Sequence, residues 1–505
     1  MNLNNDNIFA KYTDKETFQR IKYFGTMDNL WNSAVKEFKS NIALQDSNRK
    51  FTYIEMDQEV AKFRAVLASN GIKKGDVVGV YAPNSIEWVK AFLAITTSGC
   101  LAVLLPPHLP EQALFGLGMK YQMKAIVYHP ALNEKIDALN KLPHQMALIN
   151  ALSTSEESLP SVECDKKDPC VIIFTGGTTG KSKGALLNHG ALTRGSYNGC
   201  LGVKDVFNQR MLLVLPLTHV FGLVRNLLTT LQTGGTLFIT QNNKDMFKDC
   251  AIFKPTVMVM VPALAEMCLN LSKQFHRNML GESLKLIICG ASTVPPYLVK
   301  EYKPLGITLL PGYGLTESSN LVSGNPNGEY KPASVGFPYP GQDLKIVDGE
   351  LWIKGDNILD CYYKEEEETK NAFSDDGYFK TGDLVRFDGE GYLYIVGRKK
   401  EIIVLPTGEN ISPFELENKF NELDIIQDSL VYLDESSNTL AVSVYPRLVE
   451  LIKVATDNKE EYIKNEINKV NKSLPSFMRV SKITIRKEDF KRTPAMKIIR
   501  GKDNI

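Results

Sequence analysis

Short runs of valine, isoleucine and leucine alternate with longer segments of helical period along most of this chain. The runs VVGVYAP, CLAVLLP, VIIF, MLLVLP, TLFIT and LKLIICG have the length and composition of strands. Segments such as SIEWVKAFLAITTSG lie between them and repeat their apolar residues with helical spacing. This alternation restricts the fold most strongly, because it predicts an α/β fold of layered, largely parallel sheets.

The pattern changes twice toward the C-terminus. From DLKIVDGELWIKG onward, short strands separated by turns (LKIVD, ELWIK and GYLYIVG) predict a small antiparallel, β-barrel-like module. After Arg398 the chain becomes rich in lysine, glutamate and asparagine and predicts a compact α+β domain of about 100 residues. We therefore expect a large N-terminal domain over residues 1–398 and a small, mobile C-terminal domain over residues 399–505. The run KEEEETK, from Lys364 to Lys370, is interpreted as a solvated helix face.

Composition limits the function classes. Of the 505 residues 43% are hydrophobic, which is enough for several cores, and 59 basic against 58 acidic residues give a net charge of +1. No global field therefore favours nucleic acid or an anionic membrane. The first residues lack the pattern of a signal peptide, and no apolar run has membrane-spanning length, so we expect a cytoplasmic protein. Eight scattered cysteines without metal-ligand spacing are interpreted as buried thiols of a reducing compartment.

The stretch FTGGTTGKSKGALLNHG contains a glycine-rich loop that is not a Walker A motif. That motif requires glycine at position 175, where this chain has Thr175, and a helix directly after the loop. Here SKGALL is typical of a strand, and the helical pattern begins only near Asn188.

A strand, a flexible turn and a returning strand from Lys183 explain this stretch better. Glycines allow a close approach of the backbone to an anion, threonine hydroxyls add donors, and Lys183 adds a positive charge. An ordinary glycine and threonine turn without a ligand remains an alternative from this segment alone. The candidate phosphate-binding residues of the turn are Thr175, Gly176, Gly177, Thr178, Thr179 and Gly180.

Five segments occur in an order that decides between these alternatives: the loop above, GYGLTES, YFKTGDLVRF, GRKKEIIVLPTGENISPFELE and RTPAMKIIRG. Together they resemble the adenylate-forming superfamily, which includes acyl-CoA synthetases, non-ribosomal peptide adenylation domains and firefly luciferase. The resemblance covers nearly the whole chain. The loop departs from the family pattern at Gly176, where a serine is usual, and at Ser182, where a proline is usual.

The resemblance implies a role for each motif residue at the nucleotide. Tyr313 is expected to stack on adenine, Thr316 to contact the α-phosphate and Glu317 to bind Mg²⁺. Asp383 is expected to accept hydrogen bonds from the ribose hydroxyls, and Arg398 to contact ribose or phosphate. Taken singly, most of these residues also have an ordinary structural interpretation. Further positions expected at the nucleotide are Gly290, Ala291, Gly312 and Gly314.

The resemblance also implies the reaction, in which ATP and coenzyme A are co-substrates. A carboxylic acid attacks the α-phosphate of ATP, an acyl-adenylate and pyrophosphate form, and a thiol then displaces AMP. Lys497 is the expected catalytic lysine of the first step, beside Thr316 and Glu317. The small domain is expected to rotate about a hinge near Lys400 and to bring Gly408 to the thiol channel for the second step. A simple turn glycine is the alternative for Gly408.

The acid is less defined, and a medium- or long-chain fatty acid or an aryl acid is expected. His219, Gly222 and Ser292 are the candidate residues of the acyl pocket or thiol channel, although His219 also fits a hydrogen-bonded core histidine. Arg225 interrupts an apolar helical stretch and is expected at the surface; the alternative places it in the acid pocket, binding a second polar group of the substrate. The pantetheine arm of a carrier protein is a rival acceptor. A non-catalytic nucleotide-binding relative is a rival function, and the presence of Lys497, Glu317 and Asp383 argues against it.

Overall fold

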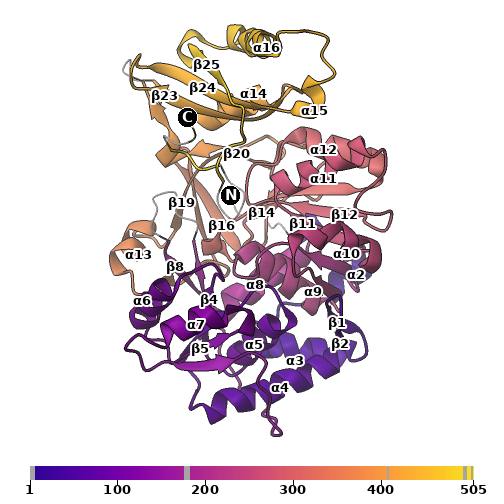
Figure 1. Ribbon diagram of the computed structural model, residues 1–505, viewed down its shortest axis with the longest axis vertical. Coiled ribbons are helices and arrows are strands. Elements are labelled where there is room, and N and C mark those ends of the chain that lie inside the picture. Colours follow the sequence, from indigo (N-terminus) through magenta and orange to yellow (C-terminus); the bar gives the residue numbers. More distant parts are fainter. Residues whose placement is uncertain (1–5, 176–181, 406–408, 493–497, 502–503, 505) are drawn as a thin grey trace.

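Two large, mainly parallel sheets form the body of the N-terminal part of the chain (Figure 1). The computed structural model describes residues 6–175, 182–405, 409–492, 498–501 and 504. The first sheet has the order β18 (Cys361–Tyr362), β8 (Gly184–Asn188), β7 (Pro169–Phe174), β4 (Leu101–Leu105), β3 (Val77–Tyr81), β5 (Ala125–Tyr128) and β6 (Ala147–Asn150). The second has the order β15 (Phe337–Pro338), β14 (Ser323–Gly324), β13 (Thr308–Tyr313), β12 (Leu286–Cys289), β11 (Val257–Met260), β9 (Arg210–Leu213), β10 (Thr236–Ile239), β1 (Ile42–Gln45) and β2 (Lys50–Thr52). These strands confirm the predicted layered α/β fold.

Helices between the strands cover the two sheets. Helix α5 (Ile86–Thr97) is buried along its whole length, because it packs on α3 (Met27–Phe38), α4 (Tyr53–Ser69) and strands β3 and β4. A mostly apolar helix is expected in such a position. The other helices of this part are α1 (Asp6–Ala10), α2 (Lys15–Arg20), α6 (Glu111–Tyr121), α7 (Asn133–Leu139), α8 (His189–Cys200), α9 (Thr229–Gln232), α10 (Met246–Phe253), α11 (Pro262–Gln274) and α12 (Pro296–Tyr302).

The expected β-barrel-like module is, in the described residues, an antiparallel sheet of four strands. Its order is β16 (Gln342–Val347), β17 (Glu350–Gly355), β19 (Phe379–Phe387) and β20 (Leu393–Arg398). The acidic run after Lys364 forms helix α13 (Glu366–Ala372) with its three first glutamates exposed, which confirms the predicted solvated helix.

The C-terminal part has its own hydrophobic core, which includes Leu416, Phe420, Val442 and Ile467. It lies above the two large sheets in Figure 1. A separate core of this kind is the physical basis for an independent domain, and the boundary at residues 398 and 399 stays a prediction. The elements are β21 (Ile403–Val404), β22 (Asn410–Ile411), α14 (Pro413–Asn421), β23 (Ile426–Asp434), β24 (Thr439–Pro446), α15 (Leu448–Leu451), α16 (Lys459–Ser473) and β25 (Lys482–Ile485).

A buried ion pair joins the two parts. Nε of Arg447, directly after β24, donates to Oε1 of Glu266 on α11 across 3.1 Å. The Arg447 guanidinium also lies over the ring of Tyr297 on α12, 4.6 Å from its centroid. In the part of the chain that the structure describes, no helix combines the length and the apolar character needed to cross a membrane.

Candidate active site

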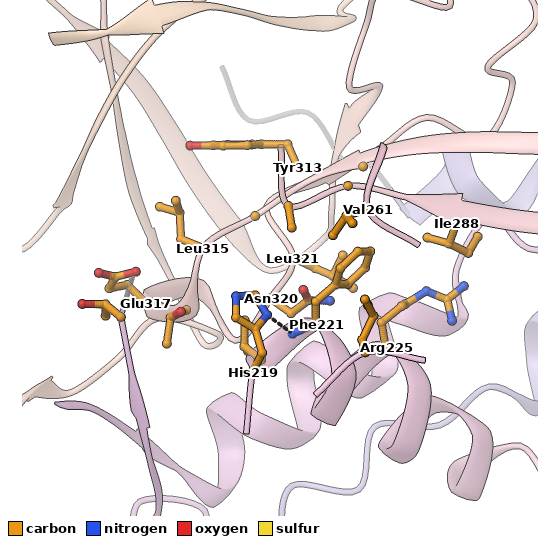
Figure 2. Close-up of a pocket in the computed structure, with 18 of the residues that line it drawn as sticks. His219, Phe221, Arg225, Val261, Ile288, Tyr313, Leu315, Glu317, Asn320 and Leu321 are labelled. Carbon is orange, nitrogen blue, oxygen red and sulfur yellow. Dashed lines mark hydrogen bonds between the residues drawn. The ribbon is translucent and has the colours of Figure 1, made fainter. Parts of the chain in front are cut away.

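A cavity of about 1570 Å³ is lined by residues of both parts of the chain. The large part contributes segments around His219 and Glu317, and the small part contributes Asp489 and Arg492. Figure 2 shows Glu317 on one side of this cavity, His219 and Phe221 near its centre and Arg225 on the other side. Most of the predicted site residues that the structure describes line this cavity, although they are separated by long stretches of sequence.

The base of the glycine-rich loop lies at the cavity. Strands β7 and β8 are antiparallel neighbours, and the amide of Thr175 donates to the carbonyl of Lys183 across 2.9 Å. Helix α8 starts only after β8, with Asn188 as its cap, which confirms the predicted strands on both sides of the loop. The loop residues Gly176, Gly177, Thr178, Thr179 and Gly180 lie outside the described residues.

Ser182 closes the loop by a hydrogen bond that the sequence did not reveal. Its hydroxyl donates to the carbonyl of Thr175 across 2.7 Å. The usual proline at this position restricts the backbone but has no such donor. At this position a side-chain hydrogen bond therefore replaces the backbone restraint that proline would give.

Lys183 lies in a charged cluster at the same end of the cavity. Its ammonium pairs with the carboxylate of Glu368 on α13 and lies 4.8 Å from the ring centroid of Tyr362. The hydroxyl of Tyr362 in turn donates to Oε1 of Glu317 across 2.7 Å, and burial together with this carboxylate raises the pKa of Tyr362. Tyr362 and Glu368 belong to no motif, so the sequence did not indicate them as site residues.

The segment after β13 places Thr316 and Glu317 in the cavity wall. Gly314 permits this course, because a Cβ atom there would lie 1.5 Å from the carbonyl oxygen of Asn320. Thr316 is buried, and Glu317 is held by Tyr362. A carboxylate that lines the cavity and is oriented by a hydroxyl donor fits the hard oxygen ligand that Mg²⁺ prefers.

Asp383 connects two residues of the predicted nucleotide site. Tyr313 donates its hydroxyl to Oδ2 of Asp383 across 2.6 Å, and Nε of Arg398 donates to Oδ1 across 2.7 Å. The Asp383 carboxylate raises the pKa of Arg398. Tyr313 and Arg398 line the cavity, whereas Asp383 is 2% exposed and lies behind them. Asp383 therefore positions a ring and a guanidinium, and its predicted contact with ribose stays a prediction.

Backbone atoms after β12 and in β13 form the next part of the wall. Gly290, Ala291 and Gly312 line the cavity, and a Cβ atom on Gly290 would lie 3.0 Å from the carbonyl oxygen of Gly312. Ala291 has a φ of 67°, a left-handed conformation that costs a residue with a side chain roughly 1 kcal/mol. Such strain is common at functional sites. Ser292 is exposed and is not among the lining residues.

His219 lines the cavity directly before the π-helix η2 (Phe221–Leu228). Its Nδ1 accepts a hydrogen bond from the amide of Phe221 across 3.3 Å, so the neutral ring carries its proton on Nε2. Gly222 does not line the cavity; a Cβ atom there would lie 2.2 Å from the carbonyl oxygen of Pro216. Close packing therefore accounts for glycine at this position.

Arg225 corrects one expectation. It is 2% exposed and lines the cavity, so the expected surface position is wrong. All eight residues of η2 are buried, because the helix packs on α8, β9 and β11. A single arginine in an apolar helical stretch indicates an exposed face only where the helix has one.

The segment between the two parts also reaches the cavity. Lys400 and Lys399 line it, and Nζ of Lys399 donates to Glu350 of β17 across 2.9 Å. Arg492 lines the cavity from the small part and is the last described residue before position 498. Gly408 and Lys497 lie outside the described residues.

A second cluster of polar groups, Asp28, Cys164 and His189, is buried away from the cavity lining. One candidate ligand atom of each lies within 4.8 Å of the others. Nδ1 of His189 accepts from the amide of Met27 across 3.1 Å, so the proton lies on Nε2, which then has no lone pair for a metal. Burial lowers the pKa of His189 to about 4, and the ring is therefore neutral.

Comparison with known proteins identifies the family. A model described as AMP-binding enzyme matches residues 31–363, and one described as AMP-binding enzyme C-terminal domain matches residues 400–503. The chain is 28% identical over 442 residues to a long-chain-fatty-acid–CoA ligase, FadD15, of Mycobacterium bovis, covering 73% of this chain and 72% of that one. It is 28% identical over 437 residues to an indoleacetate–CoA ligase of Aromatoleum aromaticum, covering 80% and 84%.

Solved structures show the same fold. The anthranilate CoA ligase AuaEII, in complex with anthranoyl-AMP, matches with a TM-score of 0.84 at 19% identity and covers 95% of this chain and 97% of its own. The family model alone spans more than half of the chain. The chain therefore belongs to the AMP-binding enzyme family, which confirms the predicted membership of the adenylate-forming superfamily and the predicted enzyme class, an AMP-forming acyl-CoA ligase.

Proposed function

We propose that this chain activates a carboxylic acid with an apolar body as its acyl-adenylate and transfers the acyl group to coenzyme A. One observation carries the proposal: a single cavity combines a charged end with an apolar part. Lys183, Thr316 and Glu317 lie at the charged end, where a nucleotide triphosphate is expected. The apolar lining residues suit a fatty or aryl acid, and they include Phe221, Val261, Leu264, Met267, Leu271 and Ile288.

In the first half-reaction, a carboxylate oxygen of the acid attacks the α-phosphorus of ATP, and the bond to the pyrophosphate oxygen breaks. Negative charge spreads over the phosphate oxygens, so positioned donors and cations stabilise the transition state. Thr316 and Lys183 both line the cavity. Thr316 is proposed to donate to the α-phosphate, and Lys183, once released from Glu368, to neutralise the pyrophosphate. Lys497 is proposed to bridge the acid and the α-phosphate.

A magnesium ion is the proposed cofactor, and Glu317 is the residue that would hold it. When bound, the ion neutralises phosphate charge. The contribution of the protein is the orientation of Glu317, whose Oε1 accepts the hydroxyl of Tyr362. The ring of Tyr313, held by Asp383, is proposed to stack on adenine, and Arg398 to bind the ribose or a phosphate.

In the second half-reaction, the sulfur of coenzyme A attacks the carbonyl carbon of the adenylate. The new carbon–sulfur bond forms, the bond to the phosphate oxygen breaks, AMP leaves, and the thiol proton is released to water. Rotation of residues 399–505 about Lys400 is proposed to bring Gly408 to the thiol channel.

All eight cysteines are free, seven of them buried, which supports the proposal of a reducing, cytoplasmic location.

The test is ATP–pyrophosphate exchange across a panel of carboxylic acids, followed by thioester detection with coenzyme A. Exchange with a fatty or aryl acid and a thioester product supports the proposal. Exchange without a thioester indicates a carrier protein as the acceptor, and silence from every acid indicates a non-catalytic relative.

Two variants separate the half-reactions. Replacing Lys497 by Ala removes a positive charge from the first transition state, which typically costs about 3 kcal/mol, a factor of about 100 or more. Exchange should collapse, while transfer from a preformed acyl-adenylate largely survives. Replacing Gly408 by Leu should leave exchange near normal and block transfer. Equal losses in both half-reactions, with both variants folded, would contradict domain rotation.

A further inference from the structure

Arg225 is a buried cation at the cavity wall that lacks a counter-ion among the described residues. Its side chain lines the cavity and the residue is 2% exposed. Its Nη1 atom is buried without a hydrogen-bond partner, and the guanidinium has no hydrogen bond or ion pair within the described part of the chain. Arginine keeps its proton at any physiological pH, so the site holds an uncompensated positive charge.

The other buried arginines of the described chain have partners. Arg64 donates to the carbonyl of Leu159 across 2.8 Å and to Thr97 across 2.9 Å. Arg447 pairs with Glu266 across 3.1 Å. These two follow the rule that buried charges are paired or hydrogen-bonded, whereas Arg225 departs from it. An anion bound in the cavity would give Arg225 the partner that it lacks.

The surroundings of Arg225 would also favour an anion. Its nearest electrostatic neighbours are Tyr339 and Cys200, and burial raises the pKa of both groups to about 12, so both are neutral at pH 7. Tyr339 lines the cavity and offers a hydroxyl donor. Asn320 lines it too, is 6% exposed, and its Nδ2 donor has no partner among the described residues. The cavity lining therefore carries these two donors, and neither electrostatic neighbour of Arg225 carries a negative charge at pH 7.

We propose that Arg225 binds a second carboxylate of the substrate, so that the preferred acid is a dicarboxylic acid with an apolar spacer. This inference rests on the proposed function, because the first carboxylate is the one that is activated. In Figure 2 the Arg225 guanidinium and Glu317 lie on opposite sides of the labelled residues. The side chains of Phe221 and Val261 lie between these two sides, and Ile288 lies on the side of Arg225. These three apolar side chains line the cavity and suit the spacer.

A carboxylate fits this end better than a phosphate. One carboxylate carries a single negative charge, which balances the single charge of Arg225, whereas a phosphate monoester would leave excess negative charge buried. The planar guanidinium also matches a carboxylate through two parallel hydrogen bonds.

The test compares matched pairs of acids on the wild type and three variants. The pairs are hexanoate and hexanedioate, octanoate and octanedioate, and decanoate and decanedioate. The variants are Arg225→Met, Arg225→Lys and, as a control for the loss of a buried arginine, Arg64→Met, which lies outside the cavity lining. Two quantities are measured for each acid: kcat/KM for pyrophosphate exchange, and the shift in Tm that the acid produces.

At one spacer length the wild type should prefer the diacid. Hydrogen bonds to charged groups predict a loss of roughly 10- to 100-fold in diacid kcat/KM for Arg225→Met, with monoacids unchanged or improved. The diacid kcat/KM of Arg225→Lys should lie between those of the wild type and Arg225→Met, because lysine keeps the positive charge but lacks the two parallel donors of the guanidinium. Arg64→Met should keep the ranking of acids. The Tm of Arg225→Met without ligand should equal or exceed that of the wild type, since an unpaired buried charge has been removed.

Two results would overturn the inference while the proposed function stands. The first is a wild type that prefers the monoacid at every length, with a ranking of acids that Arg225→Met leaves unchanged. The second is a Tm of Arg225→Met as low as that of Arg64→Met. The Tm shifts test the inference separately. A diacid that raises the Tm of the wild type but not of Arg225→Met supports it even if no acid gives exchange, which would instead contradict the proposed function.

Discussion

The ion pair between Arg447 and Glu266 predicts that the position of the small domain can be changed by a single substitution. Glu266→Gln keeps the size of the side chain and removes the negative charge, so the buried guanidinium of Arg447 loses its counter-ion. The bond from Nη1 of Arg447 to the carbonyl of Asp424, 2.8 Å long, lies within the small part and survives. The change therefore acts on the contact between the two parts.

The size of the effect follows from the geometry. At 3.1 Å and an effective dielectric constant of about 20, Coulomb's law gives an attraction of about 5 kcal/mol. Both side chains are at most 10% exposed, so desolvation offsets part of this attraction. Removing one partner of such a pair typically costs about 3 kcal/mol or more, which shifts the equilibrium between docked and released small domain by a factor of about 100.

Two assays measure this shift. Arg492, shortly before Lys497, lines the cavity in the docked arrangement, so Glu266→Gln should slow pyrophosphate exchange more than transfer from a preformed acyl-adenylate. Limited proteolysis between residues 399 and 412 should become faster. The matched control replaces both Glu266 and Arg447 by Met, because an apolar pair of similar volume commonly restores the contact. Unchanged exchange and cleavage in Glu266→Gln, or a double variant as impaired as the single one, would refute the reasoning.

Two further predictions concern Glu317 and His189. Glu317→Gln should stay folded, and its amide oxygen should still accept the Tyr362 hydroxyl. Pyrophosphate exchange by this variant should need more Mg²⁺, because an amide oxygen binds the ion more weakly than a carboxylate does. A Mg²⁺ titration that equals that of the wild type would contradict the assignment. The pKa of His189 is about 4 in the folded chain against about 6.5 when unfolded, so the unfolded state alone binds the proton between these values. Stability should be full above pH 6.5 and fall by about 3 kcal/mol as the pH drops to 4, in urea unfolding of the N-terminal part. His189→Gln should flatten this slope and His276→Gln, at an exposed histidine, should keep it; equal slopes in all three proteins would show that His189 is not responsible.

Local sequence patterns predicted those helix and strand positions that depend on neighbouring residues. The start of helix α8 after Asn188 and the antiparallel strands that follow residue 342 were both predicted, because capping residues and alternation act over a few positions. The motif residues Tyr313, Glu317 and Arg398 were found for a related reason, since each motif is a continuous stretch of chain.

Contacts between distant segments were not predictable in this way. Tyr362 and Glu368 reach the site through an interaction with Lys183 and Glu317 that no spacing in the sequence reveals. The burial of Arg225 depends on packing around the π-helix, and π-helical geometry has no sequence pattern of its own. The cysteines are scattered in the sequence without metal-ligand spacing, although the fold brings Cys164 close to Asp28 and His189.

The pair between Lys183 and Glu368 has a consequence for the anions that the proposed phosphate site would accept. Because the lysine already has a counter-ion on the neighbouring helix, an incoming anion gains only the difference between two ion pairs. A singly charged ion in the cell, such as chloride or acetate, gains little from this exchange. A triphosphate carries several charges, so under the proposed role of Lys183 it would displace Glu368 at a net gain. In that role the resident carboxylate would act as a competitor that a nucleotide displaces and a weak anion does not.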